Sequence, residues 1–273
     1  MFRVLRTPLI LCIALVAMPM LCGAVAARTG TRLVLVGGGD FPEEARRWFV
    51  ANAGDSQARI LAITWATEYP EETFGDIVAD FVEYRPAEIF AAPRAPMTPE
   101  KRAEFLRLLA SATGVFFSGG DQARIMDVLA DTELADALRR RFREGVVFGG
   151  TSAGTAIMSD VMITGNGNFD VLDGSQVETR PGLGLLPADC IVDQHFIARR
   201  RQNRLLGLLM QHQGYTGIGI DEGTALIVED NVSARAVGAS KVLVIRPEAA
   251  AKSFALQVVV PGDRFTLAEA HTR

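Results

Sequence analysis

The stretch VVFGGTSAG, residues 146–154, decides the fold, because a β-branched and aromatic run passes directly into the pattern Gly150-x-Ser152-x-Gly154. In this context G-x-S-x-G predicts a sharp turn from a buried strand into a helix, with the hydroxyl of Ser152 raised above the sheet edge. The turn would also point the backbone N–H of Ala153 at a developing oxyanion. A glycine-rich turn in which the serine only caps the helix is the alternative interpretation.

Upstream of this turn, short apolar runs alternate with stretches of helical period, which is typical of βαβ units. The runs predict strands at 33–36, 60–64, 88–91, 115–117 and 146–148. The intervening stretches predict helices at 43–53, 74–83, 99–110, 122–129 and 132–144. Because the strands are almost continuously apolar, we expect a parallel sheet covered by helices on both faces.

Downstream of the turn the pattern changes. Residues 165–184 are rich in Gly, Asn and Asp and predict a long connection, followed by a strand at 190–192 and a helix from about 197 to 211. Further strands are expected at 217–220, 225–228, 234–237, 242–245 and 254–260. The fold class predicted is therefore α/β, with a mostly parallel sheet flanked by helices and an antiparallel C-terminal extension.

The N-terminus predicts export. Arg3 and Arg6 precede an apolar run at 9–22 and a small-x-small pattern at 24–26, as in a cleavable secretory signal. We therefore expect a signal peptide over 1–26, a single domain over 27–273, a secreted or periplasmic location, and no membrane attachment after cleavage. Cys190 would be the one cysteine left, so an internal disulfide is not expected, and its apolar neighbours favour a buried filler over a nucleophile.

Composition excludes several classes of protein. The chain has 273 residues, is 49% hydrophobic and 22% charged, and carries a formal net charge of −4, as a globular domain does. No basic block is present to neutralise a run of phosphates, so nucleic acid is not expected as a partner. The three histidines are scattered and no Cys-x-x-Cys spacing occurs, so neither a metal site nor another cofactor is predicted.

A serine nucleophile needs an imidazole to take its proton. His212 lies near the end of a predicted helix and His271 close to the C-terminus, so both are expected at the surface. His195 instead follows the strand at 190–192, at the strand end where open α/β sheets place their sites. His195 is the predicted base, and the strand-end run 219–223 offers Asp221 or Glu222 to orient it.

Three further features surround this predicted triad. Gly120, in the turn after the strand at 115–117, could offer a backbone N–H to the oxyanion, although a plain turn explains it equally well. Arg199, Arg201 and Arg204 suit a substrate carboxylate, and a solvated basic face is the alternative. The glycines at 37–39 lack the spacing of a dinucleotide or phosphate loop and predict a turn.

Taken together, these runs resemble the cyanophycinase family of serine peptidases and the related aspartyl dipeptidases, which share the flavodoxin-like fold of class I glutamine amidotransferases. The likeness extends over about 33–245 and is carried by the motifs at 37–39, 119–122, 150–154, 193–204 and 219–222. The resemblance implies Ser152 as nucleophile, His195 as base and Glu222 as its partner. It also implies a group of residues around the substrate: Gln122, Asp193, Gln194, Arg199, Arg201 and Arg204.

By this resemblance the substrate is cyanophycin, a polyaspartate whose side chains carry arginine, and the product is β-aspartyl-arginine. Thr155 departs from the pattern, because polymer-cleaving members usually have Ala there. An aspartyl dipeptidase and a non-catalytic exported binding protein are the alternatives. The chain order Ser152, His195, Glu222 disfavours an α/β-hydrolase esterase, which places its acid between the serine and a late histidine. The oligomeric state is left open, a homodimer included.

Overall fold

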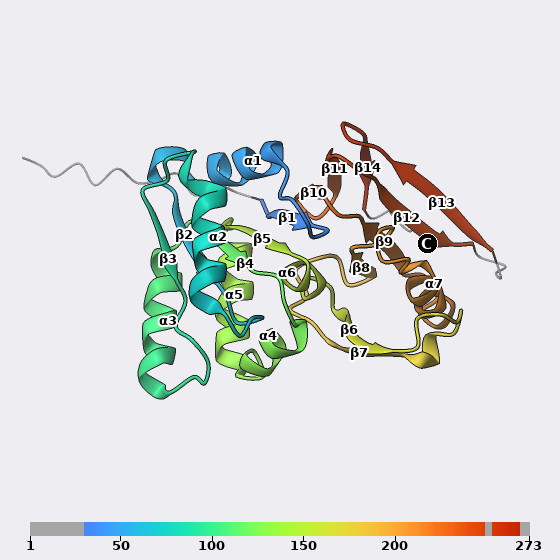
Figure 1. The fold of residues 1–273 in the computed structure, drawn as a ribbon, viewed down its shortest axis with the longest axis horizontal. Helices are drawn as coiled ribbons and strands as arrows, with labels where there is room; N and C mark the ends of the chain where they lie inside the picture. The colour runs from blue at the N-terminus through green and yellow to red at the C-terminus, as the bar shows by residue number, and fades with distance from the viewer. Residues whose placement is uncertain (1–29, 249–252, 268–273) are drawn as a thin grey trace, which may run out of the picture.

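The computed structural model describes residues 30–248 and 253–267 (Figure 1). The predicted signal peptide and His271 lie outside these described residues. Within the described part of the chain, no helix combines the length and the apolar character that crossing a membrane requires.

An eight-stranded sheet forms the centre of the molecule, in the order β14-β11-β10-β1-β5-β4-β2-β3. Five of its strands are parallel: β1 (Arg32–Val36), β5 (Val147–Thr151), β4 (Gly114–Phe117), β2 (Arg59–Ile63) and β3 (Glu88–Ala91). Three are antiparallel additions: β10 (Thr224–Glu229), β11 (Ser233–Gly238) and β14 (Arg264–Thr266). Since β1 and β5 are neighbours, their carboxyl ends place residues 37–39 beside the G-x-S-x-G turn.

Helices cover both faces of this sheet, which is why its strands are apolar on both sides. On one face, Phe49 of α1 (Glu43–Ala53) and Phe81 of α2 (Pro70–Val82) pack with Phe116 of β4. The other face is covered by α3 (Pro99–Ser111), α4 (Gln122–Val128), α5 (Thr132–Arg143) and the short α6 (Ala153–Ala156). The mostly parallel, helix-flanked α/β fold predicted from the sequence is thus confirmed.

A second sheet of four strands, in the order β13-β12-β9-β8, lies beside the first (Figure 1). It consists of β8 (Cys190–Gln194), β9 (Thr216–Ile220), β12 (Val242–Pro247) and β13 (Phe254–Val259). β8 and β9 are parallel and are connected through α7 (Gln202–Gln211). The parallel pairing places the residues after β8 and those after β9 at the same edge, where His195 and Glu222 follow.

The structure differs from the predicted elements in three places. The connection at 165–184 contains a hairpin of β6 (Val161–Gly167) and β7 (Val177–Pro181), which was hidden by its glycines and exposed polar residues. β14 was not predicted. The helix expected from about 197 begins only at Gln202, because Arg200 has a left-handed φ of 53° that interrupts the helical conformation. The turn before it is held by Asp221, which accepts from the N–H groups of Ile197 and Ala198.

Candidate active site

The turn after β5 places Ser152 at the carboxyl edge of the central sheet. Ser152 has φ 50° and ψ −108°, a strained combination for a residue with a side chain, and α6 begins directly after it. Both flanking glycines are required by close packing. A Cβ on Gly150 would lie 2.4 Å from the carbonyl group of Gly154, and a Cβ on Gly154 would lie 2.4 Å from the carbonyl oxygen of Phe117.

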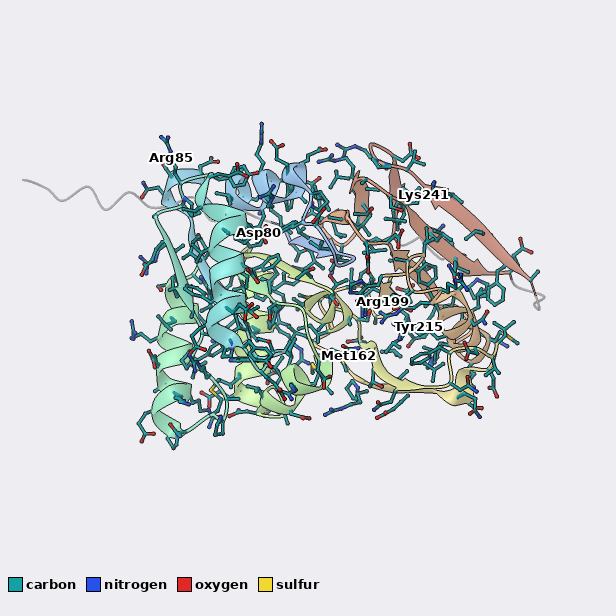
Figure 2. The ribbon with its side chains drawn as sticks, viewed as in Figure 1. Asp80, Arg85, Met162, Arg199, Tyr215 and Lys241 are labelled. Atoms are coloured by element: carbon teal, nitrogen blue, oxygen red, sulfur yellow. The ribbon has the colours of Figure 1, made fainter. Side chains whose placement is uncertain are left out.

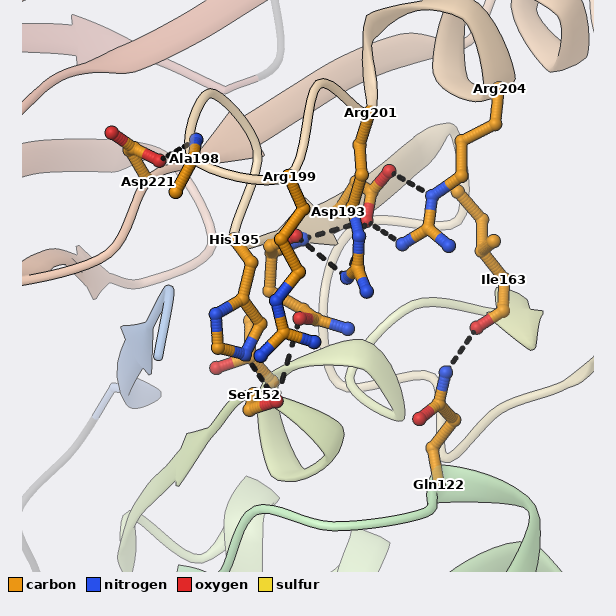
Figure 3. Close-up of polar contacts among 12 residues, drawn as sticks. Gln122, Ser152, Ile163, Asp193, His195, Ala198, Arg199, Arg201, Arg204 and Asp221 are labelled. Atoms are coloured by element: carbon orange, nitrogen blue, oxygen red, sulfur yellow. Dashed lines mark hydrogen bonds and ion pairs between the residues drawn. The ribbon is translucent and has the colours of Figure 1, made fainter. Parts of the chain in front are cut away.

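The structure brings Ser152, His195 and Glu222 together, from the ends of three strands. Ser152 Oγ lies 2.8 Å from His195 Nε2, and the opposite ring nitrogen, Nδ1, is hydrogen-bonded to Glu222 Oε1 (Figure 3 shows the serine and the imidazole). Asp221 has another role, because its Oδ1 accepts from the backbone of Ile197 and Ala198 at 2.9 and 2.8 Å. Of the two carboxylates that the sequence left open, Glu222 is therefore the one that contacts the imidazole.

Three successive backbone carbonyls, beginning with that of the last residue of β1, hold the three segments in place. The carbonyl of Val36 accepts from the N–H of Ser152 at 3.0 Å, and that of Gly37 accepts from the N–H of His195 at 2.7 Å. The carbonyl of Gly38 accepts at 2.9 Å from the N–H of Gly223, the residue after Glu222. The glycine-rich bend is thus the common anchor of the site, a role that the sequence reasoning missed.

Gly38 also forms the wall behind the imidazole. Its φ is 102°, and a Cβ there would lie 2.1 Å from Cε1 of His195. A left-handed residue without a side chain is consequently required at this position, and the triple glycine was the signal in the sequence that pointed to it.

The electrostatic surroundings keep His195 neutral. Burial lowers the pKa of His195, the hydrogen bond that its ring donates to Glu222 raises it, and the positive charges of Arg199 and Arg201 lower it, with a net shift downwards from 6.5. A neutral imidazole at physiological pH is the form that can accept the proton of Ser152.

The proposed oxyanion donors lie beside the serine. A Cβ on Gly119 would be 3.4 Å from Ser152 Cβ, so the loop that carries Gly120 packs against the nucleophile. Gly120 has φ 132°, and a Cβ there would be 2.3 Å from the carbonyl oxygen of Ala66. The N–H groups of Gly120 and Ala153 donate to no carbonyl among the described residues, which leaves both free to bind a substrate oxygen.

Among the residues expected around the substrate, Gln194 and Arg199 lie at the triad. Gln194 Oε1 is 3.4 Å from Ser152 Oγ, and Arg199 Nε is 3.6 Å from Glu222 Oε1, with more than half of the arginine side chain exposed. Arg201 lies behind them, and its Nη1 donates to the carbonyl of Gln194 at 2.8 Å. Burial, together with the charge of Arg204, lowers the pKa of Arg201 to about 10.

Three of the expected substrate residues are occupied elsewhere. Arg204 Nε donates to Asp193 Oδ2 at 2.7 Å and its Nη2 bonds the other carboxylate oxygen, in a pair whose two side chains are each 1% exposed. Phe169, from the β6–β7 loop, lies 4.8 Å from the guanidinium of Arg204. Gln122 is buried, and its amide donates to the carbonyl of Ile163 at 2.8 Å (Figure 3). In this structure each of these two buried charges neutralises the other, and the substrate contact expected of Asp193 and Arg204 stays a prediction.

Of the remaining single residues of the sequence analysis, Thr155 lies under the turn that carries Ser152, and Cys190 and His212 lie elsewhere. Cys190 is fully buried, and burial raises the pKa of its thiol to about 12. His212 ends α7 and contacts Tyr215. Thr155 is buried beneath the turn, with Oγ1 2.7 Å from the carbonyl of Val36. In residues 30–248 and 253–267, no three His, Cys, Asp or Glu side chains are grouped as metal ligands would be.

The comparisons with known proteins agree with one another. The profile of the family described as Peptidase family S51 matches residues 33–235. The cyanophycinase of Trichormus variabilis is 34% identical over 223 residues, which cover 80% of this chain and 74% of the relative, and that of Synechococcus elongatus is 36% identical over 203 residues, covering 73% and 62%. The crystal structure of a peptidase from an acI-B1 actinobacterium has the same fold, with a TM-score of 0.69 and 22% identity over 88% of this chain and 98% of that one.

Proposed function

This chain belongs to peptidase family S51 and is a serine-type peptidase, and from that premise we propose that it hydrolyses cyanophycin to β-aspartyl-arginine through a Ser152 acyl-enzyme. The observation that carries the proposal is the continuous hydrogen-bonded chain from Ser152 Oγ through the imidazole of His195 to the carboxylate of Glu222.

In the first step, Ser152 Oγ attacks the peptide carbonyl while His195 Nε2 takes the hydroxyl proton. Glu222 accepts a hydrogen bond from Nδ1–H, which selects the tautomer with a free Nε2 and stabilises the imidazolium that forms. The N–H groups of Gly120 and Ala153 bind the oxyanion. His195 then donates its proton to the leaving amine, and a water deprotonated by His195 hydrolyses the ester.

Two observations support this substrate class. The relatives that match most of the chain carry the name cyanophycinase. In addition, the exposed guanidinium of Arg199 and the partly buried one of Arg201 lie beside the triad, where they suit the carboxylates of an aspartyl-arginine unit.

We also propose that the protein is exported, on the basis of Arg3, Arg6 and the apolar run before 24–26. Expression of the full chain, cell fractionation and the N-terminal sequence of the external product test this proposal. A product that begins after Ala26 supports export, whereas full-length protein confined to the cytoplasm contradicts it.

The activity is tested by incubating the protein with purified cyanophycin and identifying the soluble products by mass. Release of β-aspartyl-arginine is the expected result. Intact polymer together with cleavage of small aspartyl peptides would instead indicate an aspartyl dipeptidase. If neither substrate is cleaved and a fluorophosphonate probe fails to label Ser152, the protein is a binding protein.

A further inference from the structure

A cavity lies beside the segments that carry Ser152 and Glu222, on the face of the sheet covered by α1 and α2. Its volume is about 440 Å³, and it is lined by Gly39, Asp40, Phe41, Arg46, Asp80 and Thr151. Thr151 directly precedes the nucleophile. A Cβ on Gly39 would lie 3.3 Å from the Cβ of Glu222. The cavity, called here the α1–α2 cavity, is thus lined by the residue before Ser152 and by Gly39, which packs against Glu222.

Negative charge dominates the α1–α2 cavity. Burial raises the pKa of Asp80, and the carboxylates of Asp76, Asp40 and Glu83 act in the same direction, against the single opposing charge of Arg46. That guanidinium is already engaged, since its Nη1 lies 3.2 Å from Glu83 Oε1, 3.3 Å from the carbonyl oxygen of Asp80 and 3.8 Å from Asp80 Oδ1. A cation that enters the cavity would therefore relieve repulsion among carboxylates that the protein leaves incompletely neutralised.

The triad thus has opposite charges on its two sides. Arg199 and Arg201 lie on one side, and Asp40 and Asp80 lie on the other. In the view of Figure 2, Asp80 on α2 and Arg199 lie to the left and right of β1. A substrate unit that carries both a carboxylate and a guanidinium is complementary to this arrangement, because the arginines attract the carboxylate and repel the guanidinium.

We propose that the α1–α2 cavity is a specificity subsite that binds the guanidinium of an arginyl unit adjoining the scissile bond. This proposal rests on the proposed function. Asp40 and Asp80 accept its N–H donors, as carboxylates do in bidentate pairs with arginine. The cavity volume lies within the range of small-molecule sites and accommodates one such side chain.

The test compares two synthetic substrates, (β-Asp-Arg)3 and its citrulline counterpart, in which each guanidinium is replaced by a neutral urea of similar shape. For the wild-type protein and for Asp40→Asn and Asp80→Asn, kcat/KM is measured on both. The matched control is Asp127→Asn, an exposed aspartate in a separate cavity lined by Trp65 and Met97. Each cavity variant is expected to lower kcat/KM about tenfold for the arginyl trimer only, because the variant loses a charge-assisted hydrogen bond to the guanidinium.

An equal effect on both trimers, or the same effect from Asp127→Asn, overturns the subsite. A measurement of binding distinguishes a failure of the subsite proposal from a failure of the proposed function. Calorimetric titration of Ser152→Ala, with and without Asp80→Asn, measures the affinity for each trimer independently of turnover. If the wild-type protein cleaves neither trimer while Ser152→Ala binds the arginyl one more tightly through Asp80, the subsite stands and the proposed function fails. Equal affinity for both trimers overturns the subsite whatever the activity.

Discussion

Ser152 Oγ lies 2.8 Å from His195 Nε2, and both residues have left-handed backbone conformations, with φ of 50° and 49°. Such conformations are unfavourable for residues with side chains and persist only where the surroundings impose them. Here the adjacent carbonyls of Val36 and Gly37 bond the two backbone N–H groups. The end of β1 therefore sets the distance between hydroxyl and imidazole, although the two residues are 43 positions apart in the chain.

Replacing Ser152 by Ala removes the proposed nucleophile. We expect turnover of cyanophycin to fall by about 10⁴-fold or more while substrate binding is retained, because the remaining site is unchanged. Initial rates and calorimetric titration measure the two effects. Ser175→Ala, at an exposed serine of the β6–β7 loop, is the matched control and should keep full activity. Wild-type turnover by Ser152→Ala would show that the nucleophile lies elsewhere.

The pH dependence of kcat/KM should change when the charge of Arg199 is removed. Activity requires neutral His195, so kcat/KM falls as the pH drops through the His195 pKa, which lies below 6.5. Arg199 lowers that pKa, and Arg199→Gln should therefore raise it and move the acidic limb of the profile to higher pH. Arg200→Gln, at an exposed arginine in the same turn, should leave the limb in place. A limb that stays fixed or moves to lower pH in Arg199→Gln contradicts this interpretation.

A methyl group at Gly38 should displace the imidazole. Its Cβ would lie 2.1 Å from His195 Cε1, and φ is 102°, so we expect Gly38→Ala to lower kcat by about 10²-fold, as a displacement near 1 Å does. Gly75→Ala, where no atom lies within 4 Å of the new Cβ, should keep full activity and stabilise α2 by up to about 1 kcal/mol. Unchanged kinetics for Gly38→Ala would exclude Gly38 as the wall behind the ring.

The ion pair of Asp193 and Arg204 should contribute to the stability of the fold. Asp193→Asn leaves a buried guanidinium without its counter-charge, and we expect the free energy of unfolding to fall by about 3–5 kcal/mol in urea titrations. Arg180→Met removes the exposed ion pair with Asp127 and should cost no more than about 1 kcal/mol. A small change in stability for Asp193→Asn, with a large rise in KM, would instead indicate that these residues contact the substrate.

Asp221 should stabilise the turn after β8 in a pH-dependent way. Burial raises its pKa, but the hydrogen bonds from Ala198, Ser240, Glu222 and Ile197 outweigh burial and lower it below 3.8. The contribution is therefore present above pH 3.8 and lost as the pH falls through the lowered pKa of the folded state. Asp221→Asn should reduce the free energy of unfolding by about 1–3 kcal/mol at pH 7.

Urea titrations at pH 7 and at pH 3 measure this difference. The gap between wild type and Asp221→Asn should narrow at the lower pH, because pH 3 lies below the ordinary pKa of 3.8 and the stabilisation by the ionised carboxylate is being lost there. A gap that is the same at both pH values would show that the charge of Asp221 contributes nothing to the turn.

The local sequence pattern was sufficient to predict much of the fold. Apolar periodicity and glycine positions predicted α1 with its observed bounds and the parallel strands to within a few residues, because a strand covered on both faces or an amphipathic helix is visible in neighbouring residues. The β6–β7 hairpin was missed because the apolar run at its start, 161–163, is short and the rest of both strands is mostly exposed and polar or glycine. The late start of α7 was missed because the turn at Ile197 and Ala198 is held by Asp221, which is distant in sequence.

By itself the sequence determined the α/β alternation, the turn that carries Ser152, and the placement of His195 at a strand end, since each depends on residues that are adjacent along the chain. Only the tertiary structure decided that Glu222 and not Asp221 contacts the imidazole, and that Asp193 and Arg204 are buried against each other. The physical reason is that successive residues after a strand point in different directions. Which of them meets a partner depends on how β8, β9 and β12 pair, and no local pattern encodes that pairing.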